Sequence, residues 1–368
     1  MDITASRDDI ISWLRLSLLP GVSAGVQRKL LVAFETPQGV LAAPPQSISE
    51  CAQDARVASL IAAGPDRRLL DATLEWIERD GHHLITLGDT TYPPALLQIH
   101  DPPTVLYARG DIERLAGPAF AIVGSRNATP QGMRDAYAFA NALSEAGLTI
   151  VSGLALGIDS AAHRGGLAGA GSSVAVLGTG AERIYPSRNR ALGEELAARG
   201  CLLSEFPLGS APLPGNFPRR NRLISGLARG VLVVEAAVRS GSLITARDAL
   251  EQGREVFAIP GSIHAPHSKG CHWLIKEGAK LVEQADDVLM ELGLACAGET
   301  CRQRSAPRER DPVLAAIGYA AASIDEIAER TGLDAAKLAA LLSRLEIEGR
   351  VQALAGGRFQ RVESRVIE

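Results

Sequence analysis

Short apolar runs alternate with helical stretches from about residue 84 to residue 292, and this alternation leaves few possible folds. Runs rich in Val, Ile and Leu, each bounded by Gly, Pro or Ser, predict buried strands at Ala119–Val123, Leu148–Val151, Ser173–Leu177, Cys201–Ser204, Val231–Val234 and Val256–Ile259. Helices are predicted between them, for example at Gln131–Glu145, Asn189–Ala198 and Ser242–Gln252. We therefore expect an α/β fold with an extended, Rossmann-like, doubly wound and mostly parallel sheet.

A helical domain is expected before this sheet. Residues Ile10–Leu19 are apolar at helical spacing, and a second helix is predicted from about Ser23 to Phe34. The tight turn at Pro20-Gly21 between them is similar to that of a SAM-like or helix-hairpin-helix unit. Such a unit either offers turn amides to a phosphate or serves only as a small packing domain.

A winged-helix domain is expected after the sheet. Ser323-Ile324-Asp325-Glu326 is a capping box that starts one helix, Asp334–Glu348 is the next, and two short strands flank Gly356-Gly357. The second helix carries more acidic than basic residues, so a protein-docking or double-strand accessory role is at least as well supported as DNA reading. The predicted division is a SAM-like domain at 1–75, an extended Rossmann-like domain at 76–295, a basic linker at 296–311 with Arg302, Arg304, Arg308 and Arg310, and a winged-helix domain at 312–368.

Composition limits where the protein acts and how it could bind nucleic acid. The net charge is −4, so a DNA site has to be a local basic patch. Five cysteines, at 51, 201, 271, 296 and 301, form no Cys-x-x-Cys pair, which favours free thiols in a reducing compartment and no metal site. With neither a signal peptide nor an apolar run of about 18 residues, we expect a cytoplasmic protein without a membrane span.

The loops after the predicted strands are where a ligand is expected, because open parallel sheets bind ligands beyond the carboxyl ends of their strands. After the first strand comes Gly124-Ser125-Arg126, followed by a helix from about Pro130. Glycine lets the backbone approach a phosphate, the helix N-terminus offers amide donors, and Arg126 adds a positive charge. We predict an anion site here; a plain strand-to-helix turn with a surface arginine is the alternative.

Three further loops supply candidate residues. The loop after the second strand is glycine-rich and includes Gly153, but its spacing differs from that of a dinucleotide fingerprint. After the third and fourth strands come basic clusters made of Ser187, Arg188, Asn189 and Arg190, and of Phe217, Arg219, Arg220, Asn221 and Arg222. Phe217 is expected either to stack on a base or to pack in the interior. Arginines spread along one sheet edge suit a polyanion better than a single nucleotide.

Catalytic groups are not evident in these loops, and we expect neither enzymatic activity nor a cofactor. Asp159 is expected to cap its helix, and His163 to be a packed histidine. Glu235 either acts on a ribose or a water or, as we favour, anchors the turn Arg239-Ser240-Gly241-Ser242 that follows it.

The combined motifs resemble those of the DNA-processing protein DprA (Smf) family. The resemblance rests on Ile122–Arg126, Ser152–Asp159, Ile184–Pro186, Phe217–Gly226, Ser240–Ala246, Ile259–Ser262 and Gly270–Val282. It implies a protein that binds single-stranded DNA, protects incoming strands and loads RecA recombinase during natural transformation, and that forms a homodimer. By motif, Ser125, Arg126 and the basic residues after Pro186 and around Arg219–Arg222 would bind phosphates. His272, Ile275 and Leu281 would lie at the dimer surface, although Ile275 and Leu281 also suit core packing.

One departure and one rival accompany this resemblance. Family members often have a lysine directly after Tyr-Pro, whereas this chain has Ser187, so Arg188 or Arg190 would have to supply the charge. The same sheet also resembles that of nucleotide phosphoribohydrolases of the lysine-decarboxylase-like group. The matching region, Glu235–Thr245, lacks the Pro-Gly-Gly turn of that group, so a nucleotide-binding hydrolase is the alternative function.

Overall fold

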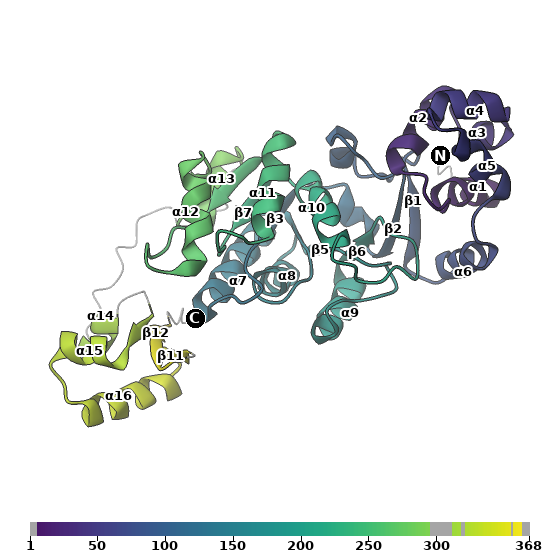
Figure 1. Ribbon diagram of the computed structural model, residues 1–368. Coiled ribbons are helices and arrows are strands. Elements are labelled where there is room, and N and C mark those ends of the chain that lie inside the picture. The colour runs from purple at the N-terminus through teal and green to yellow at the C-terminus, as the bar shows by residue number, and fades with distance from the viewer. Residues whose placement is uncertain (1–5, 295–310, 318–320, 355, 363–368) are drawn as a thin grey trace. The chain divides into compact units, whose positions relative to one another are not determined.

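The computed structural model describes residues 6–294, 311–317, 321–354 and 356–362, and it confirms the α/β fold (Figure 1). A nine-stranded sheet has the order β1-β2-β6-β5-β4-β3-β7-β8-β9. The strands are β1 (His82–Thr86), β2 (Val105–Gly110), β3 (Ala119–Val123), β4 (Thr149–Ser152), β5 (Ser173–Val176), β6 (Cys201–Ser204), β7 (Gly230–Val233), β8 (Glu255–Ala258) and β9 (Lys280–Leu281). The strands from β6 to β9 in this order run parallel, whereas β2 pairs antiparallel with both β1 and β6.

Helices cover both faces of this sheet, as the continuous apolar strands predicted. They are α7 (Pro130–Glu145), α8 (Ile158–Ala168), α9 (Arg190–Arg199), α10 (Asn216–Leu227), α11 (Ser242–Glu251), α12 (Lys269–Lys276) and α13 (Ala285–Glu291), with short 3-10 turns η1 (Pro94–Gln98), η2 (Ile112–Leu115), η3 (Ser187–Asn189) and η4 (Pro266–Ser268). Alternate residues of β3 point to opposite faces. Phe120 and Ile122 pack with residues of α7, α8 and α13, while Ala121 and Val123 pack with residues of α10, α11 and α12.

Every strand predicted from the sequence is present. The predictions for β3 and β6 match to the residue, and the others differ by one residue at one or both ends. The two antiparallel strands β1 and β2 were not predicted. His82, His83 and Leu84 in β1 are only half-buried, so this edge strand lacks the continuous apolar pattern of the central strands.

The N-terminal helices form a cluster with its own core. They are α1 (Arg7–Ser17), α2 (Ala24–Phe34), α3 (Pro37–Ala42), α4 (Pro45–Ala52), α5 (Ala55–Ala63) and α6 (Arg67–Ile77). Leu16, Leu30 and Ile48 are among the buried residues of that core. The cluster is joined to the sheet at Trp76 of α6, whose ring stacks on His82 of β1 with 4.4 Å between the centroids. The predicted pair of helices is therefore the beginning of a larger helical domain.

The last part of the chain is a separate winged-helix unit, because contacts divide the chain into Met1–Cys296 and Ala297–Glu368. The unit contains α14 (Pro312–Ile317), β10 (Ala322–Ser323), α15 (Ile324–Thr331), α16 (Ala335–Ile347), β11 (Val351–Leu354) and β12 (Arg358–Arg361). The predicted capping box at Ser323 is confirmed. Arg302, Arg304, Arg308 and Arg310 of the predicted linker, with Cys296 and Cys301, lie outside the described residues.

Helix α16, the last of the three helices described in this unit, carries two basic residues, Lys337 and Arg344. Lys337 pairs with Asp334 at 3.2 Å, and Arg344 pairs with Glu348 at 2.9 Å. Both cations are therefore balanced by acidic residues of the same segment. In the whole described part of the chain, no helix is long and apolar enough to cross a membrane.

Candidate nucleic-acid interface

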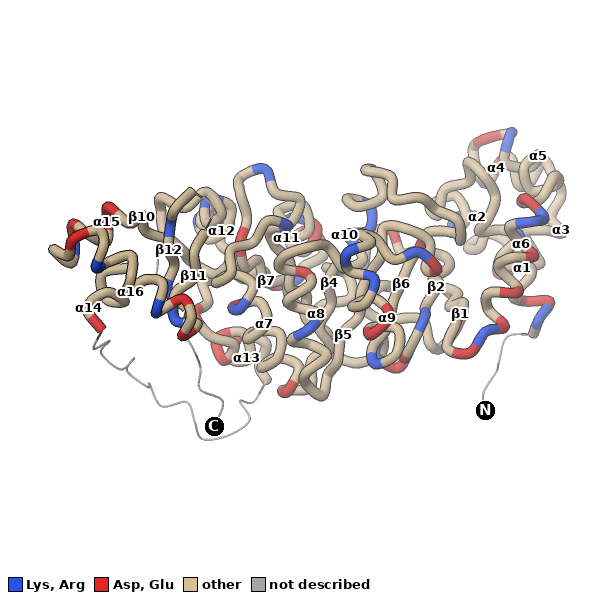
Figure 2. The backbone as a smooth tube through the Cα atoms, turned by 90° about the horizontal axis from the view of Figure 1, so that it is seen from below, with Lys and Arg blue, Asp and Glu red and all other residues tan. Residues whose placement is uncertain are grey.

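The loops singled out in the sequence lie together at the carboxyl edge of the parallel strands. The strand order places β3 between β4 and β7. The chain passes from β3 through β4, β5 and β6 on one side of β3 and then crosses to β7 on its other side. This reversal is the topological switch point at which doubly wound sheets bind ligands. Figure 2 shows basic and acidic positions interspersed along the chain, which agrees with a local rather than a global basic surface.

The turn Gly124-Ser125-Arg126 is held by the start of α8. The amide of Ile158 donates to the Ser125 carbonyl at 3.2 Å. A Cβ on Gly157, which has a φ of 79°, would lie 2.3 Å from the same carbonyl oxygen, so only glycine fits at this position. Arg126 is exposed, and its guanidinium lies over the ring of Phe217, 5.7 Å from the centroid. The turn is thus fixed while its cation faces solvent.

Glu235, two residues after the end of β7, supports the segment that follows this turn. Its carboxylate accepts hydrogen bonds from the backbone amide of Thr129 at 2.9 Å and from the Thr129 hydroxyl. Thr129 is the N-cap of α7, and its hydroxyl oxygen accepts from the Gly132 amide. Glu235 therefore anchors the start of α7 rather than the Arg239–Ser242 turn that we expected it to hold. Both of its oxygens are engaged in this contact.

Phe217 and Tyr185 form an aromatic pair next to Arg126. Their ring centroids are 5.7 Å apart, and 46% of Tyr185 is exposed. The Phe217 ring lies against Gly178, where a Cβ would come within 2.8 Å of it. Phe217 is half-buried, so it combines packing on Gly178 with an accessible edge. Tyr185 was not among the predicted site residues, although Ile184-Tyr185-Pro186 was recognised as a motif.

Arg220 and Gly153 were predicted to face DNA, and the structure corrects both positions. Arg220 is 4% exposed, and its Nη1 donates to the Gly153 carbonyl at 2.7 Å and to the Val176 carbonyl. A Cβ on Gly153 would lie 2.5 Å from that guanidinium, so the space left by the glycine is filled by Arg220. Burial lowers the pKa of Arg220 to about 10. Burial also raises the pKa of Asp159, and the charge of Arg220 opposes this increase. Arg220 and Asp159 therefore hold the loop after β4 from the interior of the protein.

Asp159 and Asn189 complete this internal support. The Asp159 carboxylate accepts from the amides of Gly153 at 3.2 Å and Ala155 at 3.3 Å. Its expected role as a helix cap was wrong, because the N-cap of α8 is Gly157. Asn189, a predicted DNA contact, is 5% exposed and donates to the Leu154 carbonyl at 2.8 Å. It therefore joins the loops after β4 and β5 instead of facing solvent.

His163 is a packed histidine, as expected. Its Nε2 accepts from the Leu154 amide at 3.2 Å, and its Nδ1 lies 2.8 Å from the Ser173 hydroxyl. Burial and the nearby Arg220 lower its pKa from 6.5 to about 3, so the ring stays neutral in the folded protein.

This histidine predicts a pH dependence of stability. Between pH 6.5 and about 3 the unfolded chain binds a proton at His163 that the folded protein does not, so stability falls as the pH falls. From pH 6.5 to pH 5 this group should lower the free energy of unfolding by about 2 kcal/mol. Urea unfolding of wild type and His163→Gln at both pH values measures the effect. Equal pH slopes for the two proteins would contradict it.

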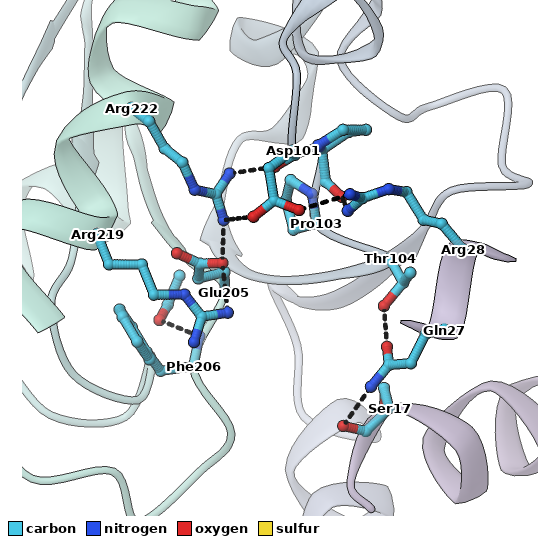
Figure 3. Close-up of polar contacts among 12 residues, drawn as sticks. Ser17, Gln27, Arg28, Asp101, Pro103, Thr104, Glu205, Phe206, Arg219 and Arg222 are labelled. Atoms are coloured by element: carbon cyan, nitrogen blue, oxygen red, sulfur yellow. Dashed lines mark hydrogen bonds and ion pairs between the residues drawn. The ribbon is translucent and has the colours of Figure 1, made fainter. Parts of the chain in front are cut away.

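Two arginines of the densest cluster, Arg219 and Arg222, converge on Glu205 (Figure 3). Arg222 is a half-buried residue that pairs with Glu205 and donates to the Asp101 carbonyl at 2.5 Å, so its predicted phosphate contact is corrected to an internal ion pair. Arg219 also pairs with Glu205, at 3.1 Å, but 52% of its side chain is exposed. Asp101 in turn binds Arg28 of α2 at 2.6 Å. The network joins α10 to the N-terminal helices.

Glu205 lies at the centre of this network. Its side chain is 1% exposed, and burial raises its pKa, against the lowering effect of Arg222 and Arg219. Asn221 lies beside these arginines, 3.5 Å from the Gly241 carbonyl, and is half-buried. Of the predicted basic cluster on α10, Arg219 is therefore the cation with the most exposed side chain.

The remaining predicted residues are accessible. Ser187, Arg188 and Arg190 are all exposed at the start of α9. Of the predicted dimer residues, Leu281 is 50% exposed on the edge strand β9. Ile275 is half-buried against the core, and the Nε2 of His272 lies 3.0 Å from the Gly261 carbonyl.

Comparisons with known proteins agree on one family. The family model described as DNA recombination-mediator protein A matches residues 83–293, and the DprA winged helix domain matches residues 300–357. Protein Smf of Escherichia coli is 44% identical over 79% of this chain and 80% of its own length. DNA processing protein DprA of Streptococcus pneumoniae is 49% identical over 55% of this chain and 72% of its own length.

Two solved structures are also similar. The X-ray structure of DprA from Streptococcus pneumoniae aligns with a TM-score of 0.67 and 38% identity, covering 77% of this chain and 96% of that one. A structure of DNA processing protein A from Helicobacter pylori, described by its single-stranded DNA binding mode, aligns with a TM-score of 0.52 and 31% identity, covering 57% of this chain and 95% of that one.

Proposed function

Because the chain belongs to the DNA recombination-mediator protein A family, also called DprA or Smf, we propose that it binds single-stranded DNA without cleaving it. In this proposal it works in the cytoplasm as a homodimer, protects incoming strands and loads RecA onto them during natural transformation. The description of the Helicobacter pylori relative as a single-stranded DNA binder supports the first step. The recombination-mediator description of the family supports the second.

The cluster of Arg126, Phe217 and Tyr185 is the observation that carries this proposal. An exposed guanidinium on a glycine turn suits a backbone phosphate, and two partly exposed rings within 5.7 Å suit an unpaired base. Bases in a duplex are already stacked on each other and cannot reach these rings. The cluster therefore favours a single strand over a duplex.

Further cations extend the proposed path along the sheet edge. Arg188 and Arg190 are exposed beside Ser187, where many family members have lysine, and we propose that they supply the missing charge. On the other side of the aromatic pair, Arg219 exposes half of its side chain. Arg220, Arg222, Asn189 and Gly153 act in this proposal by holding the loops in place.

Replacing Arg126 by alanine should weaken single-strand binding by roughly tenfold for all base sequences, since a phosphate contact carries no base information. The slope of log affinity against log salt should fall by about 0.7. Fluorescence anisotropy with a labelled oligonucleotide measures both quantities. Arg164→Ala, which removes an exposed arginine of α8, is the matched control. Full affinity of Arg126→Ala at moderate salt would show that the turn does not hold a phosphate.

RecA loading and dimerisation need separate tests. RecA filament growth on an oligonucleotide should be faster with the protein than without it. Leu281→Glu places a charge on the edge strand β9, and it should shift the sedimentation of the protein toward the monomer if Leu281 lies in the dimer contact. An unchanged sedimentation coefficient, or an unchanged filament rate with the wild type, would remove the corresponding part of the proposal.

A nucleotide hydrolase remains the second candidate function, and one observation weighs against it. Glu235 is the acidic residue that a hydrolase of this kind would use. Both of its carboxylate oxygens already accept hydrogen bonds from Thr129. Incubation with nucleoside monophosphates should therefore release no free base. Release of base at a rate proportional to protein concentration would favour the hydrolase.

A further inference from the structure

A small cavity opens at the carboxyl end of β6, between the N-terminal helices and the sheet. Its volume is about 160 Å³. The lining residues that matter for its chemistry are Ser17, Ala24, Tyr107, Glu205, Phe206 and Arg219. None of these except Arg219 was predicted as a site residue. Because Tyr107 of β2 pairs with Ser204 of β6, the cavity lies at the same sheet edge as the proposed DNA path.

Glu205 brings an unsatisfied acceptor to this cavity. Its side chain is 1% exposed, and its Oε2 binds both Arg219 and Arg222. Its Oε1 is buried, and no described residue donates a hydrogen bond to it. A buried polar atom without a partner is unfavourable by roughly 1–3 kcal/mol, so this oxygen is suited to a donor that arrives from outside.

The other walls suit a flat ring. Val22, Pro103, Val105, Phe206 and Pro207 supply apolar surface around the polar groups. A cavity of about 150 Å³ holds a benzene ring, so this one is large enough for a single six-membered ring and small for a fused purine. The Arg219 guanidinium lies over Phe206, 5.5 Å from the ring centroid, which shows that planar groups stack at this rim (Figure 3).

Arg219 also connects the cavity to the proposed path of the strand. It follows Phe217 by two residues at the start of α10, and half of its side chain is exposed. A strand with one base stacked on Phe217 and Tyr185 would have to pass Arg219, which lines the cavity, to place its next base there, and Arg219 would then meet the phosphate between the two bases.

We propose that this cavity binds the base of an unpaired cytosine, with its exocyclic amino group donating to the Glu205 Oε1. The inference rests on the proposed binding of single-stranded DNA. Cytosine has an amino donor at the position where thymine has a carbonyl acceptor, and Glu is a known partner of that amino group. Thymine would bring two acceptors together at Glu205. The protein should therefore favour cytosine over thymine while its phosphate contacts remain indifferent to sequence.

Anisotropy titrations of 20-nucleotide dC and dT strands at pH 8 test this preference. The dC strand should bind roughly fivefold to tenfold more tightly, and a dC strand with dimethylated N4 groups should bind like dT. Equal affinity for dC and dT would overturn the cavity proposal. If the wild type bound neither strand, or if Arg126→Ala bound dT as tightly as the wild type, the proposed function would be overturned instead. The two failures are therefore distinguishable.

Two variants show whether the preference arises in the cavity. Ala24→Leu adds side-chain volume at a residue that lines the cavity, and Val32→Leu, at a residue of the same helix that is 86% exposed, is its control. Ala24→Leu should abolish the preference, so that dC and dT bind about equally, while the affinity for dT stays unchanged. Val32→Leu should change neither the preference nor the affinity for dT. Glu205→Gln should also reduce the preference, because an amide can present either a donor or an acceptor. A preference that survives Ala24→Leu would contradict the assignment.

Discussion

Replacing Arg220 by methionine should lower the free energy of unfolding by about 3–5 kcal/mol, which is the largest effect we expect from any single substitution. The guanidinium donates to the carbonyls of Gly153 and Val176 and faces the buried carboxylate of Asp159. Methionine fills much of the volume but leaves the carboxylate without its cation and both carbonyls without this donor. The loop that carries Gly153 should then lose its fixed position.

Urea unfolding followed by tryptophan fluorescence measures this change, because Trp13, Trp76 and Trp273 all belong to the first compact unit. Arg229→Met, at an exposed arginine just after α10, is the control and should change stability by less than about 0.5 kcal/mol. Burial already raises the pKa of Asp159, so protonation should relieve the unpaired charge. The deficit of Arg220→Met should therefore be smaller at pH 5 than at pH 8. A deficit below about 1 kcal/mol at pH 8 would contradict the supporting role.

Replacing Phe217 by alanine should weaken single-strand binding by roughly tenfold to a hundredfold, since stacking of one base contributes about 1–3 kcal/mol. The slope against salt should not change, because no phosphate contact is lost, and this separates the effect from that of Arg126→Ala. Phe217→Leu preserves an apolar contact with Gly178 but removes the aromatic face. It should bind almost as weakly as the alanine variant.

Comparison of the two Phe217 variants decides between stacking and packing. Anisotropy gives their affinities, and urea unfolding checks that the half-buried ring is not needed for the fold. If Phe217→Leu bound as tightly as wild type, the ring would serve only to fill the space above Gly178. Tyr185→Ala should also weaken binding, by less than Phe217→Ala, because in this proposal the Tyr185 ring, 5.7 Å from that of Phe217, contacts the same base.

The central sheet could be predicted because its strands are buried on both faces, which makes each a continuous apolar run. Strand β3 is buried along its whole length, from Ala119 to Val123. The edge strand β1 has half-buried histidines and so lacks this signal. Short helices such as α3, with six residues, are too brief for a helical period to be visible in the sequence.

The candidate site was only partly predictable, because a sequence shows which charges are close along the chain but not where they point. Arg219, Arg220 and Arg222 lie within one turn of α10, and successive residues of a helix point about 100° apart. Arg220 therefore enters the interior, while Arg219 and Arg222 both pair with Glu205 and only Arg219 keeps half of its side chain in solvent. Gly153 is a second example. The absence of a side chain there does permit a close approach, but the group that approaches is the Arg220 guanidinium and not the predicted DNA.

The most direct test of the central claim is the affinity of the wild-type protein for a 30-nucleotide single strand and for its duplex, measured by anisotropy over a range of salt concentrations. Tight single-strand binding that weakens steeply with salt, together with at least tenfold weaker duplex binding, is the predicted result. Equal affinity for both forms, or single-strand binding insensitive to salt, would contradict a site built from Arg126 and the rings of Tyr185 and Phe217.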